Sequence, residues 1–172
     1  MDVLILGGQN PRHYKWVRQL SARLEPVVNR VEFIDYENWS NSQSTLNRDY
    51  EIEKITSAVN KLSSPYTIIA KSIGTVLTLK AISVRKIQPA NLILLGIPLE
   101  FFKRQPELVK ALQLVSWSTV VQNSGDPLGN AKIVFDYFHT FKIDNCTYKS
   151  LPAQTHDYLD FDLIANILLE RP

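Results

Sequence analysis

Three side chains of the kinds that together perform acyl transfer follow three separate segments of the chain: Ser72, Asp126 and His156. A serine hydroxyl is a weak nucleophile at neutral pH and needs a base within hydrogen-bond reach. Imidazole titrates near neutrality, so His156 is expected to take the serine proton and later return it to a leaving group. A carboxylate beside the imidazole orients it and stabilises its charged form, and this is the role expected of Asp126.

The segment around Ser72 predicts a sharp turn between a strand and a helix. The apolar run Thr67–Ala70 leads through Lys71 into Ser72, and a second apolar segment follows at once. Ala70 and Gly74 stand two residues before and after Ser72, and small residues are needed there because strand and helix nearly touch. The free N–H groups at the start of the helix can then stabilise a developing oxyanion. An ordinary buried serine at a strand end is the alternative.

This segment also resembles a known motif. Ala70-Lys71-Ser72-Ile73-Gly74 resembles the nucleophile elbow of the α/β-hydrolase superfamily, with Ala70 in place of the first glycine. Residues 122–129 (QNSGDPLG) resemble the acid loop of that superfamily, and residues 155–158 (THDY) resemble its histidine loop. The order serine, aspartate, histidine is also the superfamily's order. The resemblance covers essentially the whole chain and implies a serine hydrolase with these three residues as its catalytic triad.

The sequence also offers backbone N–H groups that could bind the oxyanion. The N–H of Ile73, the residue after the nucleophile, is one expected donor. The other is expected from the segment Gly7–Gln9, which follows the apolar run Val3–Leu6, and Gly8 or Gln9 is the preferred donor. The alternative is a glycine turn that only lets the chain leave the sheet. The segment lacks a G-x-G-x-x-G pattern, so a dinucleotide site is not expected.

Apolar, β-branched runs alternate with segments of helical periodicity along the chain. The expected strands are residues 3–6, 30–36, 67–70, 91–95, 118–122 and 145–151. This alternation predicts an α/β fold, a three-layer α/β/α sandwich with a mostly parallel six-stranded sheet. Right-handed crossovers favour the strand order 2-1-3-4-5-6. The superfamily resemblance further implies a compact α/β-hydrolase fold without the N-terminal strand pair and without a lid.

The expected strand order explains why the candidates can meet. In open parallel sheets, ligands bind outside the carboxyl ends of the strands, where the strand order reverses. Ser72 follows the third strand, Asp126 the fifth, His156 the sixth, and Gly7–Gln9 the first. All four therefore belong to one edge of the sheet.

Length and composition limit the classes of protein to consider. The 172 residues suit one domain spanning residues 1–172, and a net charge of +2 without a basic block predicts no nucleic-acid partner. No run approaches the ~18 apolar residues of a membrane span. A single cysteine, Cys146, allows no internal disulfide and favours a reducing compartment, so the cytoplasm is expected. No metal-ligand spacing is evident, and neither metal nor cofactor is expected.

Each candidate has a structural alternative. Asp126 precedes Pro127, which is a common way for a helix to begin, with the aspartate as its N-cap. His156 is a loop histidine, and most such histidines are solvated. Glu100 follows the fourth strand and is a second candidate for the acid, whereas Asp35 is expected to be structural.

Several nearby residues are expected to have no catalytic role. Lys71 is expected to extend its ammonium group to solvent, with attraction of an anionic group beside the site as the alternative. Asp157 is a possible cap of the last helix, and Cys146 is expected in the core. Core packing rather than an acyl pocket is expected for the aromatic side chains Phe101, Phe102, Trp117, Phe138 and Tyr158.

The sequence therefore predicts a small, lidless serine hydrolase that cleaves a carboxylic ester or related acyl bond of a small-molecule substrate. Esterase, thioesterase, amidase and peptidase activity all fit this set of residues. The alternative is a catalytically inactive binding module on the same fold.

Overall fold

A parallel sheet of six strands forms the centre of the computed structural model, which describes residues 1–41 and 44–170. The strands are β1 (Asp2–Leu6), β2 (Arg30–Phe33), β3 (Tyr66–Lys71), β4 (Asn91–Leu95), β5 (Trp117–Asn123) and β6 (Cys146–Leu151). They lie in the order β2-β1-β3-β4-β5-β6, and every neighbouring pair is parallel. The predicted strand order is confirmed.

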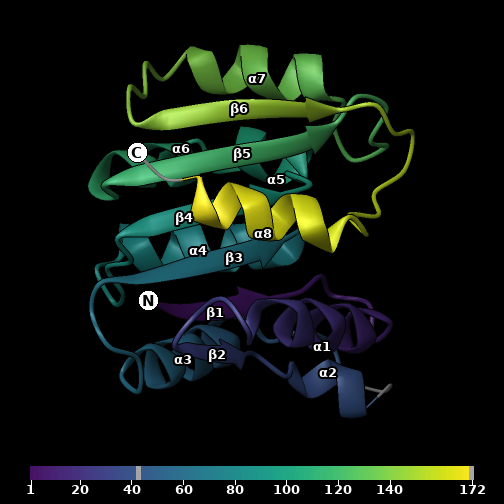
Figure 1. Cartoon of the computed structure of the whole chain (residues 1–172). Coiled ribbons are helices and arrows are strands. Elements are labelled where there is room, and N and C mark those ends of the chain that lie inside the picture. The colour runs from purple at the N-terminus through teal and green to yellow at the C-terminus, as the bar shows by residue number, and fades with distance from the viewer. Residues whose placement is uncertain (42–43, 171–172) are drawn as a thin grey trace.

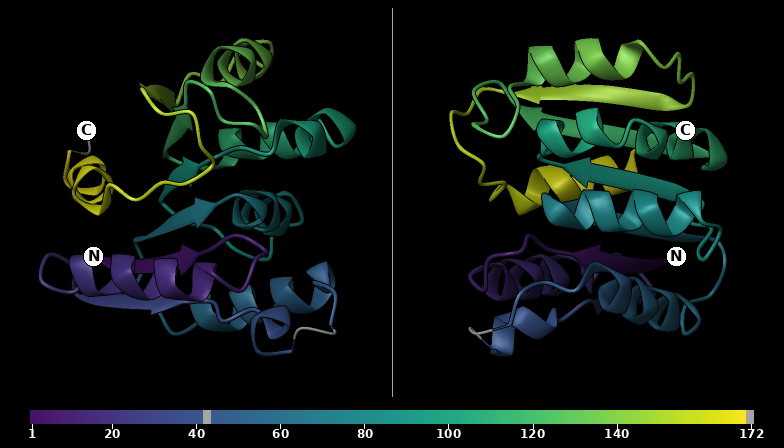
Figure 2. Two further views of the ribbon diagram at one scale, coloured as in Figure 1. Left: turned by 90° about the vertical axis from the view of Figure 1, so that its right-hand side faces the viewer. Right: turned by 180° about the vertical axis from the view of Figure 1, so that it is seen from behind.

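Helices cover both faces of the sheet (Figure 1). They are α1 (His13–Leu24), α2 (Glu37–Ser40), α3 (Arg48–Val59), α4 (Ile73–Ser83), α5 (Leu99–Arg104), α6 (Glu107–Lys110), α7 (Ala131–His139) and α8 (Phe161–Leu169), with a 3-10 turn, η1 (Ala111–Leu114). Helices α1 and α8 lie on one face, and α3 to α7 lie on the other (Figure 2). The chain has the three-layer α/β/α architecture that the sequence predicts.

The inner strands are buried on both faces, which explains their continuous apolar runs. Side chains alternate between the faces of a strand. In β1, Val3 and Ile5 pack with α1 and α8, whereas Leu4 and Leu6 pack with the helices of the opposite layer. In β3, Ile69 lies on the α1 face, so Lys71, two residues later, projects from the same face.

The six strands point the same way, so their carboxyl ends form one edge, at the right of Figure 1. Gly7 follows β1, Ser72 follows β3, Gly96 follows β4, Asp126 lies in the turn after β5, and His156 lies in the segment after β6. The topology thus brings to one edge residues that are far apart in the sequence.

The structure differs from the prediction in two connecting regions. The second strand ends at Phe33 rather than Tyr36, and α2 begins in the stretch expected to be a loop, of which residues 42 and 43 lie outside the described residues. Residues 98–114, where the spacing of Leu108 and Leu112 predicts one short helix, form three short pieces, α5, α6 and η1. Pro106, which cannot donate a backbone hydrogen bond, stands at the boundary between α5 and α6.

Two further features bear on what the chain can do. Within the described ranges, none of the helices has both the length and the apolar character to span a bilayer. Cys146 begins β6, is half-buried and packs against the core, and burial raises the pKa of its thiol. A thiol with a raised pKa is a poor nucleophile at neutral pH, as expected of a packing residue.

Candidate active site

Ser72 occupies the turn between β3 and α4 in a strained backbone conformation. Its φ is 56° and its ψ is −123°, a region that non-glycine residues rarely adopt, at a cost of about 1–3 kcal/mol. The turn is held by hydrogen bonds from the Ser72 N–H to the Leu95 carbonyl (2.9 Å) and from the Thr75 N–H to the Ser72 carbonyl (2.9 Å). The strain keeps Ser72 out of both β3 and α4, and its side chain remains partly exposed.

Gly74 shows why this turn needs a small residue. A β-carbon at Gly74 would lie 2.8 Å from the carbonyl oxygen of Gly7 and 2.9 Å from Cβ of Leu6. The first turn of α4 therefore lies directly against the end of β1. This close contact places the segment after β1 beside the N–H groups at the start of α4.

Asp126 and His156 form a hydrogen-bonded pair. His156 Nδ1 donates to the Asp126 carboxylate, at 3.0 Å from Oδ1 and 2.8 Å from Oδ2. The side chain of Asp126 is fully buried, and the carboxylate also accepts hydrogen bonds from the Tyr158 hydroxyl (2.8 Å) and the Leu128 N–H (2.8 Å). These donors fix the carboxylate, which in turn fixes the imidazole and assigns the Nδ1 proton.

The other imidazole nitrogen has no partner. His156 Nε2 is buried and makes no hydrogen bond to any described residue. The His156 ring packs against Gly96, where a β-carbon would lie 2.8 Å from its Cε1. Ser72 bonds to the neighbouring residue, Leu95. His156 and Ser72 therefore both contact the Leu95–Gly96 turn, but no hydrogen bond joins the Ser72 hydroxyl to Nε2.

The segment Gly7–Gln9 has its carbonyls paired and two of its amides free. Its three carbonyls accept hydrogen bonds from the side chains of α2 and the residue before it: Tyr36 to Gly7 (3.1 Å), Trp39 to Gly8 (3.2 Å) and Asn38 to Gln9 (2.8 Å). Within the part of the chain that the structure describes, the amides of Gly8 and Gln9 donate no hydrogen bond. Unpaired amides beside a helix N-terminus are suited to bind an oxyanion.

Comparison with solved structures identifies this arrangement of elements. A lidless α/β serine hydrolase from Xanthomonas campestris superposes with a TM-score of 0.74 at 15% identity, over 97% of this chain and 78% of that one. The chain has the α/β-hydrolase fold. Est1E from Butyrivibrio proteoclasticus, solved with ferulic acid bound, matches with a TM-score of 0.71 at 13% identity, over 98% of this chain and 86% of that one.

A third solved structure, the thioesterase domain from the curacin biosynthetic pathway, matches with a TM-score of 0.68 at 12% identity, over 99% of this chain and 91% of that one. No protein-family model and no curated protein sequence matches the chain. At these identities the likeness shows the fold, and the chemistry has to be argued from the residues of this chain.

The contacts in the structure bear on the helix-capping alternatives for Asp126 and Asp157 and on the other candidate acids. Helix α7 is capped by Asn130 and α8 by Asp160, so neither Asp126 nor Asp157 caps the next helix. Glu100 is exposed on α5 and pairs with Lys103 at 2.9 Å. Asp35 is exposed as well. Of the weighed acids, Asp126 is the one that contacts His156.

The prediction for Lys71 is wrong. Its side chain is fully buried rather than extended to solvent, and Nζ lies 2.8 Å from Nε2 of His13. The ammonium group lies 5.9 Å from the ring centroids of Trp16 and Tyr158. Lys71 is buried because α1 and the segment after β6 both cover this face of β3, which the local sequence does not reveal.

Sequence reasoning missed the residues that hold the site. Tyr36, Asn38 and Trp39 lie in a stretch expected to be strand end and loop, and no spacing motif marks them. Tyr158 was expected to be a core residue; it is buried, yet its hydroxyl also bonds the Asp126 carboxylate. The other core expectations hold for Phe102 and Phe138, which pack together at 5.6 Å.

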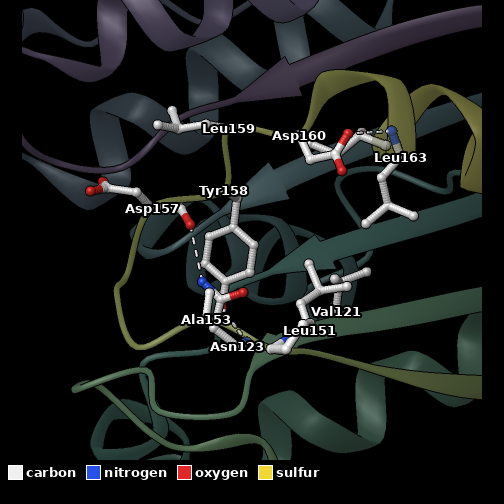
Figure 3. Close-up of a pocket in the computed structure, with 11 residues that line it drawn as sticks. Val121, Asn123, Leu151, Ala153, Asp157, Tyr158, Leu159, Asp160 and Leu163 are labelled. Carbon is white, nitrogen blue, oxygen red and sulfur yellow. Dashed lines mark hydrogen bonds between the residues drawn. The ribbon is translucent and has the colours of Figure 1, made fainter.

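A cavity of about 250 Å³ lies beside Tyr158, between the end of β5 and α8. Figure 3 shows the Tyr158 ring beside it, with Asn123 bonded to the Tyr158 hydroxyl and to the Asp157 carbonyl. Neither Ser72 nor His156 lines this cavity. No three His, Cys, Asp or Glu side chains of residues 1–41 and 44–170 gather as a metal site.

Proposed function

We propose that this protein is a serine hydrolase that cleaves a carboxylic ester or related acyl bond of a small molecule. Ser72 is the nucleophile, His156 the general base and Asp126 the acid that orients it. The observation that carries the proposal is the Asp126–His156 pair, with Nε2 unpaired, beside the strained turn at Ser72. A perturbed backbone and an unpaired buried nitrogen at one edge of the sheet have no structural use that the contacts reveal.

In the first half-reaction, Ser72 Oγ attacks the carbonyl carbon of the substrate. The hydroxyl proton passes to His156 Nε2, and the carbonyl π electrons move to oxygen. The resulting oxyanion accepts hydrogen bonds from the amide of Ile73 and from Gly8 or Gln9. The tetrahedral intermediate then expels the leaving group, which takes the proton from the imidazolium and leaves an acyl-enzyme.

In the second half-reaction, water replaces the leaving group. His156 takes one water proton as hydroxide attacks the acyl carbon, and the second tetrahedral intermediate expels Ser72 Oγ, which recovers that proton. The carboxylic acid leaves. Throughout both halves Asp126 keeps the Nδ1 proton directed at its carboxylate and stabilises the charged imidazole.

The missing hydrogen bond between Ser72 and His156 is compatible with this role. Catalytic hydrogen bonds are often long in ligand-free enzymes and tighten when substrate binds. His156 lies in residues 152–160, which follow β6 and form neither helix nor strand. The Asn123 side chain donates hydrogen bonds to the Thr155 and Asp157 carbonyls of this segment.

The direct test is hydrolysis of p-nitrophenyl acetate and p-nitrophenyl butyrate. The wild type is expected to release an initial burst of p-nitrophenol equal in amount to the enzyme, followed by slower turnover. Ser72→Ala should abolish the burst, and Ser116→Ala, which changes an exposed serine outside the site, should retain it. Equal rates for Ser72→Ala and the wild type would contradict the proposal and favour a binding module on the same fold.

A further inference from the structure

Lys71 is the residue immediately before the proposed nucleophile, and its side chain is enclosed by protein. It ends β3 on the face covered by α1, and it is fully buried. Its one hydrogen bond within the described residues runs from Nζ to His13 Nε2 at 2.8 Å. The ion pairs formed by the described residues do not include Lys71, although Asp126 and Asp157 are near enough to interact with its charge.

The electrostatics fix the direction of this hydrogen bond. Burial is the main reason that the pKa of Lys71 falls to about 8, so the amine is mostly protonated near neutral pH. Burial, followed by the charge of Lys71, lowers the pKa of His13 to about 4, so the imidazole is neutral. An ammonium group only donates hydrogen bonds, and therefore His13 accepts at Nε2 and carries its proton on Nδ1.

The other side of the His13 ring lies against Gly8. A β-carbon at Gly8 would lie 2.4 Å from both Nδ1 and Cε1 of this ring, so a larger residue at this position would collide with the imidazole. His13 itself is anchored at the start of α1, where its N–H donates to the Asn10 carbonyl at 2.9 Å. A rotation of the imidazole would therefore press on Gly8 or leave it unsupported.

We propose that Lys71 and His13 are positioning residues that hold the Gly8 and Gln9 amides toward the oxyanion. Lys71 fixes the imidazole of His13, and the imidazole lies against Gly8, whose carbonyl accepts a hydrogen bond from Trp39. Lys71, the residue before the proposed nucleophile, is thereby linked to the segment after β1. The amide of Ile73 and the amides of Gly8 and Gln9 are then held in a fixed position relative to each other. This inference rests on the proposed function, because it concerns the same oxyanion.

The ammonium group is more than a space-filling element in this arrangement. Burying a charge without a carboxylate partner costs free energy, and apolar residues of similar volume in such places often leave a fold as stable or more so. Lys71→Met should therefore fold. It removes the donor that orients His13 while keeping an unbranched side chain of similar length. This substitution separates the hydrogen bond from the packing.

The test compares four variants by p-nitrophenyl butyrate hydrolysis and by the ¹⁵N order parameter of the Gly8 amide. Lys71→Met and His13→Leu remove the donor and the acceptor. His13→Gln keeps a side-chain acceptor for Lys71, and Lys110→Met is the control, since it replaces an exposed lysine on α6. Urea unfolding of each variant shows whether the fold is intact.

Lys71→Met and His13→Leu are expected to lower kcat about 10- to 100-fold with KM within twofold of the wild type, because loss of an oxyanion donor costs about 10²–10³ in kcat. The Gly8 order parameter should fall from about 0.85 to below about 0.6. His13→Gln should retain most of the wild-type kcat and order parameter. Lys110→Met should match the wild type in both.

An unchanged Gly8 order parameter in Lys71→Met and His13→Leu overturns the proposal, whatever their rates. So does a wild-type kcat in folded Lys71→Met when the wild type is active, and this leaves the role of Ser72 untouched. A wild type that hydrolyses no ester contradicts the proposed function instead. In that case the order parameters alone decide whether Lys71 and His13 position Gly8.

Discussion

The imidazole of His156 and the carboxylate of Asp126 are separated by 30 residues in the chain and by 2.8 Å in space. Asp126 is held by Tyr158 and Leu128, and His156 packs against Gly96. The pair is therefore fixed from both ends before any substrate binds. In the proposed mechanism, such preorganisation lowers the free-energy cost of reaching the transition state.

Asp126→Asn should leave the fold intact and lower kcat by roughly 10⁴. The amide is similar in size to the carboxylate, but it does not stabilise the imidazolium and it permits the wrong tautomer. Steady-state hydrolysis of p-nitrophenyl butyrate measures the loss. Glu100→Gln is the control, because Glu100 is exposed and pairs with Lys103, and it should stay within twofold of the wild type. A folded Asp126→Asn enzyme with wild-type activity would remove Asp126 from the mechanism.

Tyr158→Phe should lower both stability and activity. The hydroxyl donates to Asp126 and accepts from the Asn123 N–H at 3.0 Å, so its removal takes away the acceptor of the buried Asn123 N–H and one of the donors to the buried Asp126 carboxylate. The expected loss in the free energy of unfolding is about 1–3 kcal/mol, measured by urea denaturation. Tyr50→Phe, a change at a half-exposed position on α3, should have little effect. Equal stabilities for the two variants would show that the Tyr158 hydroxyl is not needed.

Gly96→Ala should impair activity more than stability. Gly96 has a φ of +65°, and a β-carbon there would lie 2.7 Å from Tyr158 and 2.8 Å from His156. Alanine in this conformation costs about 1–2 kcal/mol, and the new methyl group must displace the imidazole. Because small misplacements of a reacting group can cost about 10²-fold, kcat should fall by about that factor. A folded variant with unchanged kcat would mean that His156 has no fixed catalytic position.

Acid should destabilise the protein through His13. Its pKa is about 4 in the folded chain, below the ordinary value of 6.5, because burial and Lys71 disfavour the charged ring. Between these two values the unfolded chain binds more protons than the folded one, so the free energy of unfolding falls as the pH falls from about 6.5 to about 4. Urea denaturation at pH 7 and pH 4.5 measures this change. His13→Gln should show a smaller decrease, and an equal decrease would contradict the assignment.

The sequence was sufficient for the strand order, because β-branched runs alternating with helical segments leave few topologies. It also predicted that Asp126 and His156 lie at one sheet edge, and the hydrogen bond between them agrees with this expectation. The catalytic roles of Ser72, Asp126 and His156, and the oxyanion-binding roles of Ile73, Gly8 and Gln9, remain predictions. Their placement depends on the ends of β1 and β3, which are adjacent in the sheet.

The supporting residues were not predictable, because their partners lie far away in the sequence. From the sequence, Lys71 is expected to be a surface lysine. In the structure, His13 and Trp16 of α1 and Tyr158 after β6 enclose its side chain. Trp39 shows no pattern of its own, and its use becomes clear only when its indole N–H reaches the Gly8 carbonyl. Local periodicity predicts which elements form, whereas tertiary packing decides which polar side chains become buried.

The most direct measurement is mass spectrometry after reaction with a fluorophosphonate probe. The phosphonyl group should be found on the peptide Ser72–Lys80, which begins with the proposed nucleophile. Labelling should disappear in Ser72→Ala, fall sharply in His156→Ala, and persist in His139→Ala, where the replaced histidine ends α7. Labelling of another residue, or a folded wild type that never reacts, would contradict the account.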